Sequence, residues 1–268
     1  MFYKEVSEGQ KVEIPGEIVK RSSRSKANLP EYSYPSPDKA ALADKALTVT
    51  ERLAVQYGPA RWSRKDPLSM LVDIILSHRT RDQQTAAAYA ALRNRYATWE
   101  DLRDAPTAEV EATIQGVTWP ELKAPRLQAL LRRITAEQGS LNLDFLKDWP
   151  VEEGAEWLNR LQGVGPKTTA CVLLFSCRKP ILPVDTHVHR VSIRLGLIGP
   201  KVTAEAAHGL LQALLPNEAQ TIYNFHKGLL RHGQQVCVYD GPRCQQCVLR
   251  DICGYYRQVV LPKTRTLA

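Results

Sequence analysis

The chain has 268 residues, and its 44% hydrophobic content can fill one large buried core or two ordinary ones, which excludes disorder throughout. Its 36 Lys and Arg residues outnumber 28 Asp and Glu residues, and the net charge of +8 points to an anionic partner, nucleic acid first. No stretch approaches the roughly 18 apolar residues of a membrane span, and the start MFYKEVSEGQ lacks the apolar segment of a signal peptide. We therefore expect a cytoplasmic protein.

The N-terminal part of the chain changes character at about Ser36. Residues 1–35 carry little apolar periodicity and include the basic run KRSSRSK at 20–26, which predicts a flexible N-terminal segment. Ser36 is suited to cap a helix and Pro37 to its first position, and apolar residues then recur at helical spacing until Gly58. The sequence predicts the first helix here.

Helical patterns separated by Gly, Pro or capping residues cover most of the remaining chain. One wide apolar stripe, in the segment DPLSMLVDIILSHR, consists of Leu68, Leu71, Val72, Ile75 and Leu76. The other predicted helices cover residues 82–96, 107–115, 123–138, 151–161, 166–177, 186–197, 203–215 and 217–232. Strand signals are nearly absent, so the sequence predicts an all-α globular protein.

Four cysteines near the end of the chain form the pattern C-x6-C-x2-C-x5-C, and they are Cys237, Cys244, Cys247 and Cys253. Four thiolates this close can hold one metal centre, either a tetrahedral zinc ion or a cubane iron–sulfur cluster. Zinc sites more often use two short knuckles with a longer spacer, so the spacing favours iron–sulfur modestly. Cys171 and Cys177 fall in an apolar helix and are predicted to be buried and unreactive.

The segment LQGVGPKTTA (161–170) places the turn Gly163, Val164 and Gly165 between two helices and puts Lys167 in the first turn of the second. Two glycines allow a sharp turn, and free amides at the helix start can bind a phosphate, although an ordinary helical hairpin also uses glycine. The helix dipole opposes a cation at this end. Lys167 is therefore either a solvated side chain or an amine favoured in its neutral, nucleophilic form.

The segment LPVDTHVHR follows the lysine by eighteen residues and contains Asp185. The aspartate is suited to cap the next helix, and capping is compatible with a second, catalytic role. A carboxylate near a lysine amine can shuttle protons and stabilise positive charge on a sugar while the amine attacks carbon.

These three motifs, in this order and spacing, resemble the endonuclease III family of DNA glycosylases, which belongs to the helix-hairpin-helix Gly/Pro-Asp superfamily. The resemblance covers about residues 60–255. It implies that the Gly163–Gly165 hairpin binds the DNA backbone, that Lys167 is the nucleophile and that Asp185 assists it. It also implies that the four C-terminal cysteines hold a [4Fe-4S] cluster.

The resemblance further implies two helical domains that flank a DNA-binding cleft. A six-helix barrel with the helix-hairpin-helix would cover residues 60–180, and an iron–sulfur domain would combine residues 36–59 with 181–255. The remaining parts would be the flexible segment 1–35 and a C-terminal tail, 256–268.

The activity implied by the resemblance is base excision repair. A bifunctional glycosylase and AP lyase would remove oxidised pyrimidines from double-stranded DNA through a lysine Schiff base and β-elimination, acting as a monomer associated with the nucleoid. Double-stranded DNA with damaged bases is the expected partner. The alternatives are a monofunctional relative, which the presence of Lys167 disfavours, and a DNA-binding relative with little or no catalysis.

Several positions depart from the family pattern. Arg79 stands where the family usually has a glutamine that fills the gap left by a flipped base, and arginine can bind either the orphaned base or a phosphate. The loop GVTWPELKAP (116–125) is longer than usual, and Trp119 is predicted to pack locally. His187 is a candidate DNA contact with a structural hydrogen bond as its simpler interpretation, and Arg243 is the only basic residue in the loop between the first two clustered cysteines.

Overall fold

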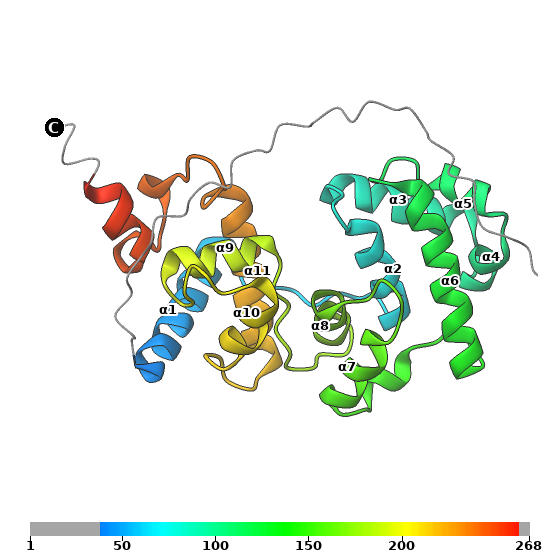
Figure 1. The fold of residues 1–268 in the computed structure, drawn as a ribbon, viewed down its shortest axis with the longest axis horizontal. Helices are drawn as coiled ribbons and strands as arrows, with labels where there is room; N and C mark the ends of the chain where they lie inside the picture. The colour runs from blue at the N-terminus through cyan, green and yellow to red at the C-terminus, as the bar shows by residue number, and fades with distance from the viewer. Residues whose placement is uncertain (1–37, 263–268) are drawn as a thin grey trace, which may run out of the picture. The chain divides into compact units, whose positions relative to one another are not determined.

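The computed structural model describes residues 38–262, and within this range every regular element is helical, which confirms the all-α class (Figure 1). The long helices are α1 (Lys39–Tyr57), α2 (Pro67–Ser77), α3 (Asp82–Arg95), α4 (Trp99–Asp104), α5 (Thr107–Thr113), α6 (Pro120–Gln138), α7 (Val151–Asn159), α8 (Pro166–Phe175), α9 (Thr186–Leu195), α10 (Ala204–Gln212) and α11 (Ala219–Gln235). Short 3₁₀ helices cover Asp144–Lys147, Cys244–Gln246 and Arg250–Ile252, and a π-helix covers Tyr256–Val260. None of these helices is long and apolar enough to cross a membrane.

The start of α1 is fixed by an aspartate. The Asp38 carboxylate accepts a hydrogen bond from the Ala40 amide at 3.2 Å, as an N-cap does. Ser36 and Pro37, which predicted this start, lie outside the described residues, as does the basic segment 20–26.

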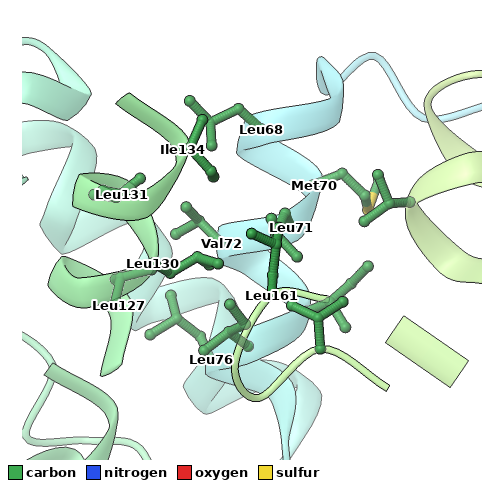
Figure 2. Close-up of a cluster of buried hydrophobic side chains, with 14 of the residues drawn as sticks. Leu68, Met70, Leu71, Val72, Leu76, Leu127, Leu130, Leu131, Ile134 and Leu161 are labelled. Atoms are coloured by element: carbon green, nitrogen blue, oxygen red, sulfur yellow. The ribbon is translucent and has the colours of Figure 1, made fainter. Parts of the chain in front are cut away.

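One buried core forms between α2 and α6 (Figure 2). The predicted stripe on α2 is confirmed, because all five of its members are buried. Leu71 and Leu76 of α2 and Leu127 and Leu131 of α6 are fully buried, and each such side chain contributes about 1.5–3 kcal/mol relative to exposure. This core anchors α2, whose C-terminal end leads into one wall of the site.

A second buried core joins α1, α9 and α11. Gly228 lets α11 approach α1 closely, because a Cβ there would stand 3.0 Å from the Leu53 Cβ. Helix α8 contributes Leu173 to the first core and Leu174 to the second. The segments that carry Lys167 and Asp185 are therefore positioned by two packed cores.

The structure differs from the sequence predictions in four places. Helix α4 was not predicted, although Thr98 and Asp101 cap each other reciprocally at its start. Helix α6 begins three residues early because Pro120 takes its first position, and residues of the expected C-terminal tail form the π-helix. Cys171 is buried as predicted, whereas Cys177 is only half-buried.

Candidate active site

A cleft of about 730 Å³ opens among α2, α8, α9 and α11. Its volume lies within the range of about 300–1,000 Å³ usual for small-molecule sites. Of the predicted site residues, it brings together Arg79, Lys167, Asp185 and His187. The glycine hairpin and Arg243 are not part of its lining.

Lys167 is positioned by the first turn of α8. Gly165 is the N-cap, Pro166 takes the first helical position, and no side chain caps the helix. The Thr168 hydroxyl lies 3.1 Å from Nε2 of His78, which ties this turn to the end of α2. Burial lowers the pKa of His78 to about 4, so the imidazole is neutral at pH 7. The Lys167 side chain is half-buried and lines the cleft.

The glycine hairpin leaves open space beside its backbone. Gly163 has a φ of 83°, which favours glycine. Gly165 has an ordinary φ of −109°, and a Cβ added there would meet nothing within 4 Å. The side chain of Val164 is buried in the first core and its amide donates to the Leu161 carbonyl at 3.0 Å, so only its carbonyl is open to a contact.

Asp185 caps α9, which confirms the sequence prediction for this role. One oxygen, Oδ1, accepts hydrogen bonds from the amides of His187 at 2.9 Å and Val188 at 2.7 Å. The preceding segment is held by the buried His226, whose Nδ1 donates to the Pro183 carbonyl at 2.9 Å. Burial lowers the pKa of His226 to about 4. These contacts fix the carboxylate and leave Oδ2 outside the cap.

His187 has the structural hydrogen bond that was its simpler interpretation. Its Nδ1 lies 3.1 Å from Nη2 of Arg190, and that nitrogen also donates to the Gly233 carbonyl at 2.8 Å. A Cβ at Gly233 would stand 2.8 Å from the His187 Cβ, so α9 and α11 pack very closely here. The imidazole still lines the cleft.

One face of α11 forms a wall of the cleft. Five residues at helical spacing line the cleft, namely Tyr223, His226, Lys227, Leu230 and Gln234. Lys227 is half-buried, and its Nζ lies 5.9 Å from the centre of the Phe175 ring. Burial, and next the charge of Arg231, lower the pKa of Lys227, while Asp82 and Asp185 oppose this shift.

Sequence reasoning missed Lys227, because one lysine on an amphipathic helix carries no signal of its own. Its place four residues after Tyr223 and three before Leu230 is the only pattern that puts it on the cleft side of α11.

Arg79, which lines the cleft, and Trp119, which contacts it, both have a left-handed backbone conformation. Each has a φ of 56°, and the Arg79 guanidinium lies 5.8 Å from the centre of the indole. The Thr118 hydroxyl donates to the Arg79 carbonyl at 2.9 Å, and the Thr118 amide donates to the Thr80 hydroxyl at 3.1 Å. Trp119 therefore contacts its neighbour, yet 48% of its surface remains exposed.

Lys123 of α6 holds the turn that carries Arg79. Its buried amine donates to the carbonyls of Leu76 at 2.6 Å and His78 at 2.8 Å, and to the Thr80 hydroxyl at 2.8 Å. Burial lowers the pKa of Lys123 to about 8. These three acceptors use all three N–H donors of the ammonium group, so Lys123 has a structural role.

All four clustered cysteines line one small pocket beside the C-terminal end of α9. The Arg194 guanidinium lies 3.4 Å from the Cys237 sulfur, and Cys247 receives the Leu249 amide at 3.4 Å and lies 3.3 Å from Nε2 of His232. Arg243 borders this pocket, is exposed, and donates to the Gln235 carbonyl at 3.1 Å. Donors directed at sulfur suit thiolate ligands.

The sulfurs do not converge on one point. Within residues 38–262, no three His, Cys, Asp or Glu side chains are gathered closely enough to hold a single metal ion. Thiolates on one zinc ion would lie about 3.8 Å apart, given a Zn–S bond of about 2.3 Å. Four cysteines that line one pocket are a donor set that suits either a zinc ion or an iron–sulfur cluster.

Known proteins resemble this chain over most of its length. Residues 72–217 match the family model of the HhH-GPD superfamily base excision DNA repair protein. Endonuclease III of Thermotoga maritima is 32% identical over 207 residues, which are 77% of this chain and 92% of that protein. A DNA glycosylase/AP lyase of Arabidopsis thaliana is 27% identical over 173 residues, which are 59% of this chain and 12% of the plant protein.

Two solved structures share the fold. A non-covalent endonuclease III–DNA complex has a TM-score of 0.70 and 24% identity, covering 82% of this chain and 98% of that one. A trapped endonuclease III–DNA covalent intermediate has a TM-score of 0.68 and 24% identity, covering 81% of this chain and 97% of that one.

Proposed function

Because the chain belongs to the HhH-GPD superfamily of base excision DNA repair proteins, we propose that it is a bifunctional DNA glycosylase and AP lyase. Its substrates would be oxidised pyrimidines in double-stranded DNA, and it would act as a monomer. The observation that carries the proposal is the pairing of Lys167 with the capped Asp185 in one cleft. An enzyme that used water as its nucleophile would need the carboxylate but not the lysine.

The proposed reaction begins with extrusion of the damaged nucleotide, which costs a few kcal/mol and less for a poorly stacked base. The Lys167 amine forms a bond to the sugar C1′, while the glycosidic bond breaks and its electron pair leaves with the base. Asp185, fixed by two amides through Oδ1, accepts the amine's proton on Oδ2 and balances the positive charge. The sugar ring then opens to a Schiff base, and β-elimination expels the 3′ phosphate.

DNA binding is proposed to use the open side of the hairpin. The uncapped amides at the start of α8 and the bare backbone of Gly163 and Gly165 suit a phosphate. Arg79, His187 and Arg243 are proposed as further contacts. If Arg79 binds a phosphate, Arg79→Ala lowers the salt slope of binding by about one, whereas a base contact lowers lesion processing alone.

The four cysteines are proposed to hold a [4Fe-4S] cluster, which would supply a structural crosslink for the C-terminal segment. Cys237 and Cys247, which already receive N–H donors, and Cys244 and Cys253, which line the same pocket, are its proposed ligands. Protein purified anaerobically should be brown and contain about four iron atoms per chain. A colourless protein with stoichiometric zinc contradicts this assignment.

Trapping with borohydride tests the proposed function. The wild-type protein is incubated with duplexes that each carry one lesion, such as thymine glycol, and reduction should link protein to DNA. Undamaged duplex is the control. Base release without trapping would indicate a monofunctional glycosylase, and binding without base release would indicate a relative that has lost catalysis. A panel of oxidised pyrimidines and purines then ranks the substrates.

A further inference from the structure

Lys227 is the cleft cation that the proposed mechanism leaves unused. Among residues 38–262 its amine has no hydrogen bond and no ion pair, and the Phe175 ring at 5.9 Å is its nearest partner of a defined kind. By contrast, Lys65 in the same cleft forms an ion pair with Asp73 at 2.8 Å. A half-buried ammonium without an acceptor lacks the compensation that buried charges usually have.

The place of Lys227 suits a base rather than the DNA backbone. It lies on the α11 wall of the cleft that Lys167 also lines, and it is beside Cys171, which is buried. Phe175 of α8 and the buried Tyr223 of α11 line the same cleft and contact each other edge-on, so the surroundings of Lys227 are largely aromatic. DNA phosphates stay near solvent, where an exposed cation such as Arg79 can reach them, whereas Lys227 is half-buried.

From this arrangement we infer that Lys227 donates a hydrogen bond to the departing base and stabilises it as an anion. The inference rests on the proposed function and deepens it. When the bond from C1′ to the pyrimidine N1 breaks, its electron pair moves onto N1 and is shared with the adjacent C2 carbonyl oxygen. The Lys227 ammonium binds that oxygen and remains protonated throughout.

The proton that Lys167 releases is transferred to the departing base within the cleft. The new bond between Lys167 and C1′ leaves a proton on nitrogen, which Asp185 accepts and passes to the base. The base departs neutral. Donors directed at developing negative charge are among the largest contributions to catalysis, typically about 10²–10³ in rate for one donor. The substrate class selected is a base with a carbonyl next to the glycosidic nitrogen, which pyrimidines and 8-oxopurines have and unmodified purines lack.

Two substrates distinguish stabilisation of the leaving base from a role of Lys227 in DNA binding or in the later lyase steps. One duplex carries thymine glycol, so the base must leave, and the other carries a preformed abasic site, so no base leaves. Lys227→Met should lower single-turnover base release by about 10²-fold and change borohydride trapping on the abasic site by less than about threefold. Lys227→Arg, which keeps the charge, should recover part of the base-release rate.

Lys65→Met is the matched control, because it removes one positive charge from the same cleft at a paired lysine. It should leave the ratio of the two rates unchanged. If Lys227→Met loses the same factor in base release on the lesion duplex and in trapping on the abasic duplex, the inference is overturned and Lys227 contributes to DNA binding. If neither rate falls, the inference is also overturned, and Lys227 lines the cleft without a role in the reaction. Failure of the wild-type protein to trap or release any base would instead refute the proposed function itself.

A second experiment tests whether Lys227 stabilises negative charge on the leaving base. Across uracils whose 5-substituents make N1 more or less acidic, base release by Lys227→Met should depend more steeply on leaving-group acidity than release by the wild type. A purely structural role would leave that dependence unchanged.

Discussion

The starts of α8 and α9 share one backbone conformation and differ in their side chains. The N-cap Gly165 has φ and ψ of −109° and −179°, and the N-cap Asp185 has −98° and −177°. Asp185 satisfies two amides of its own helix, whereas Gly165 satisfies none with a side chain. Each start is also tied down by a histidine with a lowered pKa, His78 for α8 and His226 for α9.

The difference shows how one backbone geometry supports two tasks. A capped start holds its carboxylate rigidly and has fewer free amides for a ligand. An uncapped start keeps its amides and the positive end of its dipole available to an external anion. Lys167 from the uncapped start and Asp185 from the capped start line one cleft, and the following predictions test whether the contrast between the two starts matters.

The largest expected effect is complete loss of covalent chemistry in Lys167→Gln. Glutamine keeps a similar length at the uncapped start and removes the amine, so borohydride trapping and strand cleavage should disappear. Binding to lesion duplex, measured by fluorescence anisotropy, should stay within about tenfold because the hairpin is intact. Lys179→Gln, outside the cleft lining, is the control. Undiminished trapping in Lys167→Gln would assign the chemistry to another amine, Lys227 first.

At the capped start, two variants of Asp185 should separate charge from capping. Asp185→Asn keeps a capping oxygen and loses the charge, so base release should slow by about 10²–10⁴ while stability changes little. Asp185→Ala should slow the reaction similarly and also lose about 1 kcal/mol of unfolding free energy. Urea unfolding and single-turnover rates measure both quantities. Equal stability in the two variants would contradict the cap.

Acid should loosen the start of α9 through His226. Its folded pKa of about 4 lies below the unfolded value of about 6.5, so the unfolded chain binds the proton first as the pH falls. The stability due to the neutral imidazole is full above about pH 6.5 and is lost toward pH 4, by about 2 kcal/mol at pH 5. In His226→Gln, the fall in unfolding free energy between pH 7 and 5 should be smaller by that amount. An unchanged fall would mean that His226 is protonated in the folded protein.

The smallest expected effect comes from converting one start into the other. Gly165→Asp has an allowed φ and open space for its Cβ, so it should cap α8 and raise stability by up to about 1 kcal/mol. The same carboxylate should repel a phosphate and weaken DNA binding by about tenfold. Gly163→Ala is the counterpart, since its positive φ should cost about 1 kcal/mol. Tighter DNA binding in Gly165→Asp would show that the backbone phosphate lies elsewhere.

The sequence predicted those features that depend on local pattern. The stripe of α2 and the cap by Asp185 follow from spacing and residue type, and the structure confirms both. The roles of Lys167 and of the cysteines stay predictions. Helix α4 could have been predicted from the sequence, because Thr98 and Asp101 stand three residues apart in a capping-box pattern.

Other features depend on which helices meet and leave no local trace. The bond between His78 and Thr168 joins residues 90 apart in the chain. Lys227 lines the same cleft as Lys167 only because α11 packs beside α8. Sequence spacing carries no information on such pairs until the fold is known.

The buried Lys123 makes the turn around Arg79 inseparable from α6. Its amine serves two carbonyls at the end of α2 and the Thr80 hydroxyl, and that hydroxyl in turn receives the Thr118 amide. A chimera that took only the turn around Arg79, or only the loop that contains Thr118, from a relative would therefore leave a desolvated ammonium or an unpaired carbonyl where the two loops meet. Recombination between family members should succeed only when both loops and the lysine are exchanged as one cassette.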